Sequence, residues 1–227
     1  MGGGSPMQAV LVAPGVKGKK VLAFDRVGLK EKDAVAGLIR SIVATSSPAQ
    51  RSAFHVLDLA RVADLFRAWR RALPDVRPYY AIKCNPEPAL VGALAALGAG
   101  FDCASRAEIE AVLALSVQPR SIVYANPCKP EPHLEYAAEV GVNLTTYDSA
   151  EEVAKIKDCH PNCGLLLRLK GPDGGEAKVD LGIKYGAHAD EVVPLLRAAQ
   201  RAGLNVAGVS FHVGTGASCN NVYRGAI

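Results

Sequence analysis

Short β-rich apolar runs recur at nearly constant spacing along the chain, and they begin near residues 79, 100, 121, 143 and 163. The segment after each run carries apolar residues at helical spacing. Strand and helix signals that alternate in this way predict a parallel sheet with crossover helices. The predicted strands are 78–83, 100–105, 121–126, 143–148, 164–170 and 206–213; the predicted helices are 89–98, 106–117, 133–141, 149–160 and 190–202, with a polar loop at 171–188.

Signals at the helix ends agree with this assignment. Ser105 with Glu108, and Ser149 with Glu152, have the spacing of a capping box, in which a serine begins the helix and a glutamate three residues later reaches back. Gly98 and Gly141 stand where two of the helices are expected to end.

Two architectures fit this alternation: an open doubly wound sheet and a closed (β/α)8 TIM-type barrel. An open sheet would spread the strand ends along a line, at about 4.8 Å per strand. A barrel would bring them together on one rim, where enzymes of that fold keep their chemistry. We therefore favour the barrel, because every predicted strand ends at a polar residue: Lys83, Asp102, Asn126, Asp148, Arg168 and His212.

The strand count predicts an incomplete barrel. A (β/α)8 barrel takes eight strands and about 250 residues. The barrel pattern begins near residue 58, and six strands precede Ile227. Two strands are therefore missing, and we expect the chain to be a fragment. Residues 1–19 are rich in glycine and proline and are expected to form a flexible tail.

Composition excludes several classes of protein. The 227 residues are 49% hydrophobic and 21% charged, which is typical of a globular domain and not of a disordered chain. The net charge is only +4, and no stretch interleaves basic and aromatic residues, so we expect no nucleic-acid partner. No apolar run reaches the roughly 18 residues of a membrane span. With no secretory leader, the six cysteines are expected to be reduced thiols in the cytoplasm: Cys84, Cys103, Cys128, Cys159, Cys163 and Cys219.

Lys83 and His212 are the leading candidates for chemistry. A lysine in a barrel mouth is desolvated, which favours the nucleophilic free amine, although a lysine here can also extend to solvent. The imidazole of His212 is placed to stack on a planar ligand, and the Gly214–Thr215–Gly216 sequence after it offers a hydroxyl and close backbone approach to a phosphate. The alternative is a core histidine followed by a glycine turn.

Arg168 and Asp102 are the next candidates. Arg168 interrupts an apolar run, so it is either an anion ligand or a member of a buried ion pair. Asp102 is placed to orient Lys83 or a ligand, or else to cap a loop. The capping box already explains Glu108. The spacing of Cys159, His160 and Cys163 matches no zinc pattern, and we expect no metal.

Seven motifs, in order along the chain, resemble those of the eukaryotic ornithine decarboxylases, which are pyridoxal-phosphate enzymes of the alanine-racemase-like class. They are PYYAIKCNP, GFDCAS-x-x-EI, YANPCK, TYDS, LLLRL, KYGA and SFHVGTG. The resemblance runs from about residue 20 to the last residue and implies a (β/α)8 barrel joined to a β-domain. By resemblance, residues 20–57, with a strand at 53–59, belong to the β-domain, and residues 58–227 form the partial barrel.

The resemblance also implies roles for individual residues. Lys83 matches the lysine that forms the Schiff base with pyridoxal phosphate, and His212 matches the residue stacked on the cofactor ring. Arg168 matches a residue on the cofactor side of the site. Asp102 and Glu108 match acidic neighbours of the lysine. Gly214, Thr215 and Gly216 fall at the phosphate, Thr215 where the family usually has a serine.

The activity implied is decarboxylation of L-ornithine to putrescine in polyamine biosynthesis. Family members are homodimers with shared sites, and several of their site residues would lie beyond Ile227, so we expect this chain to be weak or inactive. Two alternatives stay open. One is a sister decarboxylase for lysine, arginine or diaminopimelate, although YANPCK favours the ornithine branch. The other is a non-catalytic relative that binds an antizyme-type regulator, which the retention of Lys83, Arg168 and His212 disfavours.

Overall fold

The computed structural model describes residues 6–23, 31–46, 52–171, 184–216 and 223–224. Its centre is a parallel sheet of six strands in the order β1-β2-β3-β4-β5-β6. The strands are β1 (Tyr79–Ala81), β2 (Gly100–Cys103), β3 (Ile122–Tyr124), β4 (Leu144–Tyr147), β5 (Gly164–Leu169) and β6 (Asn205–Phe211).

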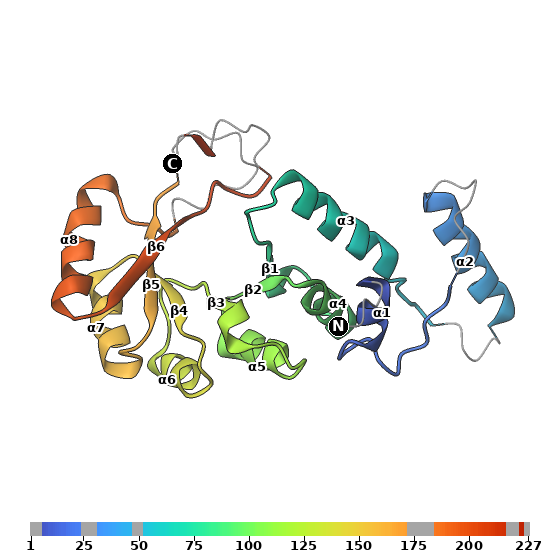
Figure 1. Ribbon diagram of the computed structural model, residues 1–227, viewed down its shortest axis with the longest axis horizontal. Helices are drawn as coiled ribbons and strands as arrows, with labels where there is room; N and C mark the ends of the chain where they lie inside the picture. Colours follow the sequence, from blue (N-terminus) through green and yellow to red (C-terminus); the bar gives the residue numbers. More distant parts are fainter. Residues whose placement is uncertain (1–5, 24–30, 47–51, 172–183, 217–222, 225–227) are drawn as a thin grey trace.

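A helix follows each of the first five strands, and Figure 1 shows these helices along one side of the sheet. Sequential strand order with helices on one side is the arrangement of a (β/α)8 barrel, whereas a doubly wound sheet carries helices on both faces. The fold class is therefore α/β, an incomplete TIM-type barrel, as predicted. The helices are α4 (Pro88–Leu97), α5 (Arg106–Leu113), α6 (Glu131–Glu139), α7 (Ala150–Cys159) and α8 (Ala189–Arg201).

The core lies between the outer face of the sheet and these helices. Register pairs Phe101 with Ile122 and Leu165 with Val206, so alternate residues of neighbouring strands share one face. Phe101 and Leu165 on that face are fully buried. Asp102 and Arg168 alternate with them and lie on the opposite, inner face. The strand pattern thus separates the packing residues from the polar residues of the site.

The predicted helix ends are largely correct, with one change in the caps. Gly98 and Gly141 have positive φ angles of 96° and 77°, as expected where helices end. The Ser105 and Ser149 hydroxyls each accept the main-chain N–H of the glutamate three residues on. The glutamate carboxylates, however, do not close a capping box: Glu108 accepts the Ala104 N–H, and Glu152 turns inward to a lysine.

The prediction of a flexible tail is wrong for residues 6–19. Helix α1 (Pro6–Val12) packs against α4, and Val10 and Val16 are buried there. The glycine and proline content that suggested flexibility instead permits close approach. A Cβ on Gly15 or Gly92 would collide with main-chain carbonyls of the facing segment, so only glycine fits at these two positions.

The prediction of strands in residues 20–57 is also wrong for the described part. Residues 31–45 form helix α2 (Glu31–Thr45), which Figure 1 shows standing apart from the barrel. Residues 52–58 are coil before α3 (Leu59–Ala72), and Phe54 there is exposed. A strand needs a neighbouring strand for its hydrogen bonds, and among the described residues none pairs with 53–58. No helix of the described chain is long and apolar enough to cross a membrane.

Candidate active site at the strand ends

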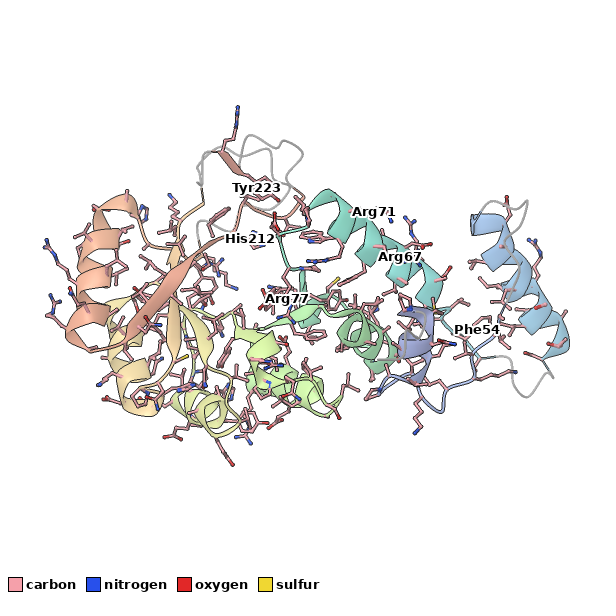
Figure 2. The ribbon with its side chains drawn as sticks, viewed as in Figure 1. Phe54, Arg67, Arg71, Arg77, His212 and Tyr223 are labelled. Carbon is pink, nitrogen blue, oxygen red and sulfur yellow. The ribbon has the colours of Figure 1, made fainter. Side chains whose placement is uncertain are left out.

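The carboxyl ends of the strands bring four of the predicted site residues into one electrostatic environment. Lys83 lies in a short 3-10 helix (Ile82–Cys84) directly after β1. Its side chain is exposed, which matches the alternative of a lysine that extends to solvent and not the desolvated amine. Asp102 and Arg168 project from the inner face near the ends of β2 and β5. His212 directly follows β6, as Figure 2 shows. The four residues thus lie at or just past the carboxyl ends of β1, β2, β5 and β6.

Charges at Asp102 show how close these groups are. Burial raises the pKa of the Asp102 carboxyl, and the neighbouring Glu108 carboxylate raises it further. The positive charges of Lys83 and Arg168 act in the opposite direction. The pKa of Asp102 thus reflects burial, one neighbouring carboxylate and two cations of opposite effect.

His212 is exposed, yet its imidazole has a pKa below the usual value. Burial lowers the pKa of the imidazole, and the positive charges of Arg168 and Lys83 lower it further. Its Nδ1 accepts a hydrogen bond from the Gly214 N–H, at 2.9 Å. An accepting Nδ1 places the proton of the neutral ring on Nε2. The imidazole therefore presents one defined tautomer and a flat, uncharged ring.

Arg168 is the more enclosed of the two cations at this rim, since Lys83 is exposed. Burial lowers the pKa of its guanidinium, and the charges of Asp148, Tyr185 and Asp102 oppose that effect. The guanidinium carbon lies 5.1 Å from the centre of the Tyr185 ring. Sequence reasoning singled out Arg168 and Asp148 but assigned no role to Tyr185, because its approach to Arg168 depends on how residues 184–187 fold back on β5.

Two other predicted residues have local structural roles. The Asn126 side chain donates to the Ala104 carbonyl oxygen and accepts from the Cys128 N–H, so it ties the end of β2 to the loop after β3. Glu108 stays within electrostatic range of Asp102, but its carboxylate accepts the Ala104 N–H. Glu108 thus has a local structural role, although the N–H that it accepts is that of Ala104 and not that of Ser105, as the predicted capping box requires.

The turn after His212 contains two glycines in the left-handed region of backbone conformation. Gly214 and Gly216 have φ angles of 93° and 71°, a region that residues with side chains rarely enter. Thr215, between them, is exposed. A cationic lysine, a cationic arginine, a neutral imidazole and a glycine turn at one rim form a chemically suitable set for an aromatic ring that carries a phosphate. Residues 172–183 of the predicted loop lie outside the described part of the chain.

Residues 59–227 match the family model described as pyridoxal-dependent decarboxylase, pyridoxal binding domain. The chain therefore belongs to the pyridoxal-dependent decarboxylase family. Among its curated relatives is the chloroplastic ornithine decarboxylase of Nicotiana glauca, 51% identical over all of this chain and 50% of that protein. Antizyme inhibitor 2 of Xenopus laevis is 40% identical over 88% of this chain and 43% of that protein.

Solved structures of the same family share the fold. The arginine decarboxylase of Paramecium bursaria Chlorella virus, bound to agmatine, gives a TM-score of 0.80 at 37% identity, over 84% of this chain and 51% of that one. The ornithine decarboxylase of Entamoeba histolytica gives 0.76 at 36% identity, over 85% and 53%. The chain thus spans about half the length of the relatives it matches.

Proposed function

We propose that this chain binds pyridoxal phosphate through Lys83 and supplies the cofactor-binding part of a decarboxylase that converts L-ornithine to putrescine. The observation that carries the proposal is the position of Lys83, Asp102, Arg168 and His212, each at or just past the carboxyl end of a strand in one parallel sheet. Membership of the pyridoxal-dependent decarboxylase family supports it.

Each residue of the rim has a distinct part in this proposal. The Lys83 amine is the covalent attachment point, and the Asp102 carboxylate orients it. The neutral His212 ring gives the cofactor ring a flat surface. Arg168 adds positive charge on the same side, and the Gly214–Thr215–Gly216 turn is proposed to contact the phosphate. When bound, pyridoxal phosphate supplies the conjugated ring that accepts the electron pair left as carbon dioxide departs.

Ornithine is proposed as the substrate because the ornithine decarboxylase of Nicotiana glauca is 51% identical over the whole of this chain. Because the chain is also similar to an arginine decarboxylase, the test includes other basic amino acids as alternative substrates. Release of carboxyl-labelled carbon dioxide from ornithine, lysine and arginine, with pyridoxal phosphate added, measures the preference. We expect low turnover, with ornithine preferred. Turnover that favours lysine or arginine would contradict the assignment.

A matched pair of lysine variants controls this assay. Lys83→Ala is expected to abolish turnover, whereas Lys157→Ala removes an exposed lysine from the last turn of α7 and is expected to leave it unchanged. Equal turnover in the two variants would overturn the role of Lys83.

A second candidate is a non-catalytic protein that binds an antizyme-type regulator, and the likeness to antizyme inhibitor 2 favours it. The two candidates separate in the same assay. A regulatory protein would bind antizyme whether or not Lys83 is present and would neither attach pyridoxal phosphate nor release carbon dioxide.

We further propose that the full protein is a homodimer and acts in the cytoplasm. The resemblance to the ornithine decarboxylases supports the dimer, and the five described cysteines, all free thiols, suit a reducing compartment. Sedimentation equilibrium tests the dimer. A fluorescent fusion tests the compartment, and a signal in plastids, the compartment in the name of the tobacco relative, would contradict the second proposal.

A further inference from the structure

Residues 185–187 run beside the end of β5 and continue the sheet where β4 has stopped. Ala187 donates its N–H to the Arg168 carbonyl oxygen at 2.8 Å, and its own carbonyl accepts from the Lys170 N–H at 2.9 Å. The other side of β5 at Leu169 is occupied by β6. The segment therefore lies on the β4 side, just beyond Tyr147, the last residue of β4.

Asp148 anchors this segment. It directly follows β4, and its Oδ2 accepts the Gly186 N–H at 2.8 Å. Gly186 has a φ of 111°, and a Cβ there would lie 2.7 Å from the Leu169 carbonyl oxygen. Only glycine fits this position, so the tight contact between the segment and the end of β5 is built into the sequence.

The anchored segment brings the Tyr185 ring close to the Arg168 guanidinium. The Tyr185 ring centre lies 5.1 Å from the guanidinium carbon, within the range of a cation–π contact. The negative charge of Asp148 raises the pKa of Arg168, against the effect of burial. The contact with the Tyr185 ring is therefore one that can hold the guanidinium in place.

We propose that Asp148 and Tyr185 are positioning residues that hold the Arg168 guanidinium at the cofactor site. Asp148 acts by anchoring residues 185–187, and Tyr185 acts by offering its ring to the cation. The proposal rests on the proposed function, because it assigns these residues to the binding of pyridoxal phosphate. Neither side chain needs to touch the cofactor.

Two substitutions at Tyr185 distinguish the effect of the aromatic ring from the effect of side-chain size. Tyr185→Phe keeps the aromatic ring, and Tyr185→Leu keeps an apolar side chain without it. We expect Tyr185→Phe to bind pyridoxal phosphate within about twofold of the unchanged chain in an absorbance titration. Tyr185→Leu is expected to bind about 2- to 30-fold more weakly, the range for a cation–π contact of ~0.5–2 kcal/mol at 1.4 kcal/mol per tenfold.

Two substitutions at Asp148 separate its hydrogen bond from its charge. Asp148→Asn keeps an oxygen that can accept the Gly186 N–H, and Asp148→Ala removes it. We expect cofactor binding to weaken in Asp148→Ala at least as much as in Tyr185→Leu, and less in Asp148→Asn. Equal binding in Asp148→Ala and the unchanged chain would remove Asp148 from the proposal.

A second readout does not depend on the cofactor. The positive charge of Arg168 lowers the pKa of His212, so a guanidinium that swings into solvent should let that pKa rise. Titration of the His212 imidazole by NMR, assigned with His212→Gln, is expected to show this rise in Tyr185→Leu and not in Tyr185→Phe. General loosening of the fold would instead lower the unfolding midpoint of both Tyr185 variants.

The two readouts distinguish the failure of this inference from the failure of the proposed function. If the unchanged chain and Lys83→Ala bind pyridoxal phosphate equally, the proposed function fails, and the His212 titration alone decides whether Tyr185 holds Arg168. If Tyr185→Leu matches Tyr185→Phe in both cofactor affinity and His212 titration, the positioning role is wrong.

Discussion

Removal of one carboxylate, Glu152, is expected to destabilise the barrel more than removal of the lysine it faces. Lys129 and Glu152 form an ion pair of 2.7 Å, and their side chains are 0% and 2% exposed. Lys155 also contacts Glu152, at 2.7 Å. The ammonium of Lys129 donates to the carbonyl oxygens of Asn126 and Thr146, at the ends of β3 and β4. This cluster therefore ties together the strand ends next to the site.

The two single variants leave different charges behind. Glu152→Gln leaves the Lys129 ammonium buried, with Lys155 as a like charge nearby, and breaking a buried pair in this way costs about 3–5 kcal/mol. Lys129→Met leaves Glu152 still paired with Lys155. The two carbonyl groups that lose this donor would cost about 2–6 kcal/mol together if left dry, and a water in the space of the ammonium brings the loss below that of Glu152→Gln. Domains are stable by about 5–15 kcal/mol, so Glu152→Gln approaches the limit of folding.

Urea unfolding followed by circular dichroism measures both costs, provided that the slope of free energy against urea is unchanged. We expect Glu152→Gln to have the lower midpoint at pH 7. Burial lowers the pKa of Lys129, and loss of Glu152 removes an interaction that raises it. In Glu152→Gln the pKa of Lys129 is therefore lower in the folded than in the unfolded chain. The unfolded chain then binds more protons at high pH, so the stability of Glu152→Gln should rise with pH toward 9. A smaller loss in Glu152→Gln than in Lys129→Met would refute this reasoning.

Two titratable groups affected by burial and one close glycine contact give three further predictions. Burial lowers the pKa of His160, so its neutral form contributes stability above about pH 6.5, and this stability is lost as the pH falls toward the folded-state pKa. His160→Gln should therefore make the thermal unfolding midpoint depend less on pH in this range. Burial raises the pKa of Asp102, so its ionised form costs stability at neutral pH, and Asp102→Asn should raise the unfolding midpoint while it weakens binding of pyridoxal phosphate; a lower midpoint would contradict this. Gly92→Ala should release α1 from α4, seen as faster proteolysis near residue 10, whereas Gly37→Ala in exposed α2 should not.

The barrel and the rim could be predicted from the sequence because both depend on local patterns. Alternating strand and helix signals fixed the order of elements, and the polar residue at each strand end placed Lys83, Asp102, Arg168 and His212 on one rim. The strands themselves are shorter than predicted. Lys83, for example, lies in a 3-10 turn and not on β1, because the apolar run continues past the last residue that pairs with β2.

What the sequence did not predict depends on contacts between distant segments. Lys129 and Glu152 are 23 residues apart, and nothing in the local pattern separates this buried pair from two exposed charges. The approach of Tyr185 to Arg168 likewise depends on how residues 184–187 return to β5. The ordered α1 was missed because glycine was interpreted as a sign of flexibility, whereas Gly15 and Gly92 are the positions where two backbones meet.

Attachment of pyridoxal phosphate to Lys83 is the central claim, and one experiment tests it directly. The chain is incubated with pyridoxal phosphate, reduced with borohydride and mapped by peptide mass spectrometry, beside Lys83→Ala and Lys157→Ala. The account predicts label on Lys83 in the unchanged chain and in Lys157→Ala, and its loss in Lys83→Ala, with little on Lys184. Label spread over exposed lysines, or undiminished in Lys83→Ala, would contradict the account.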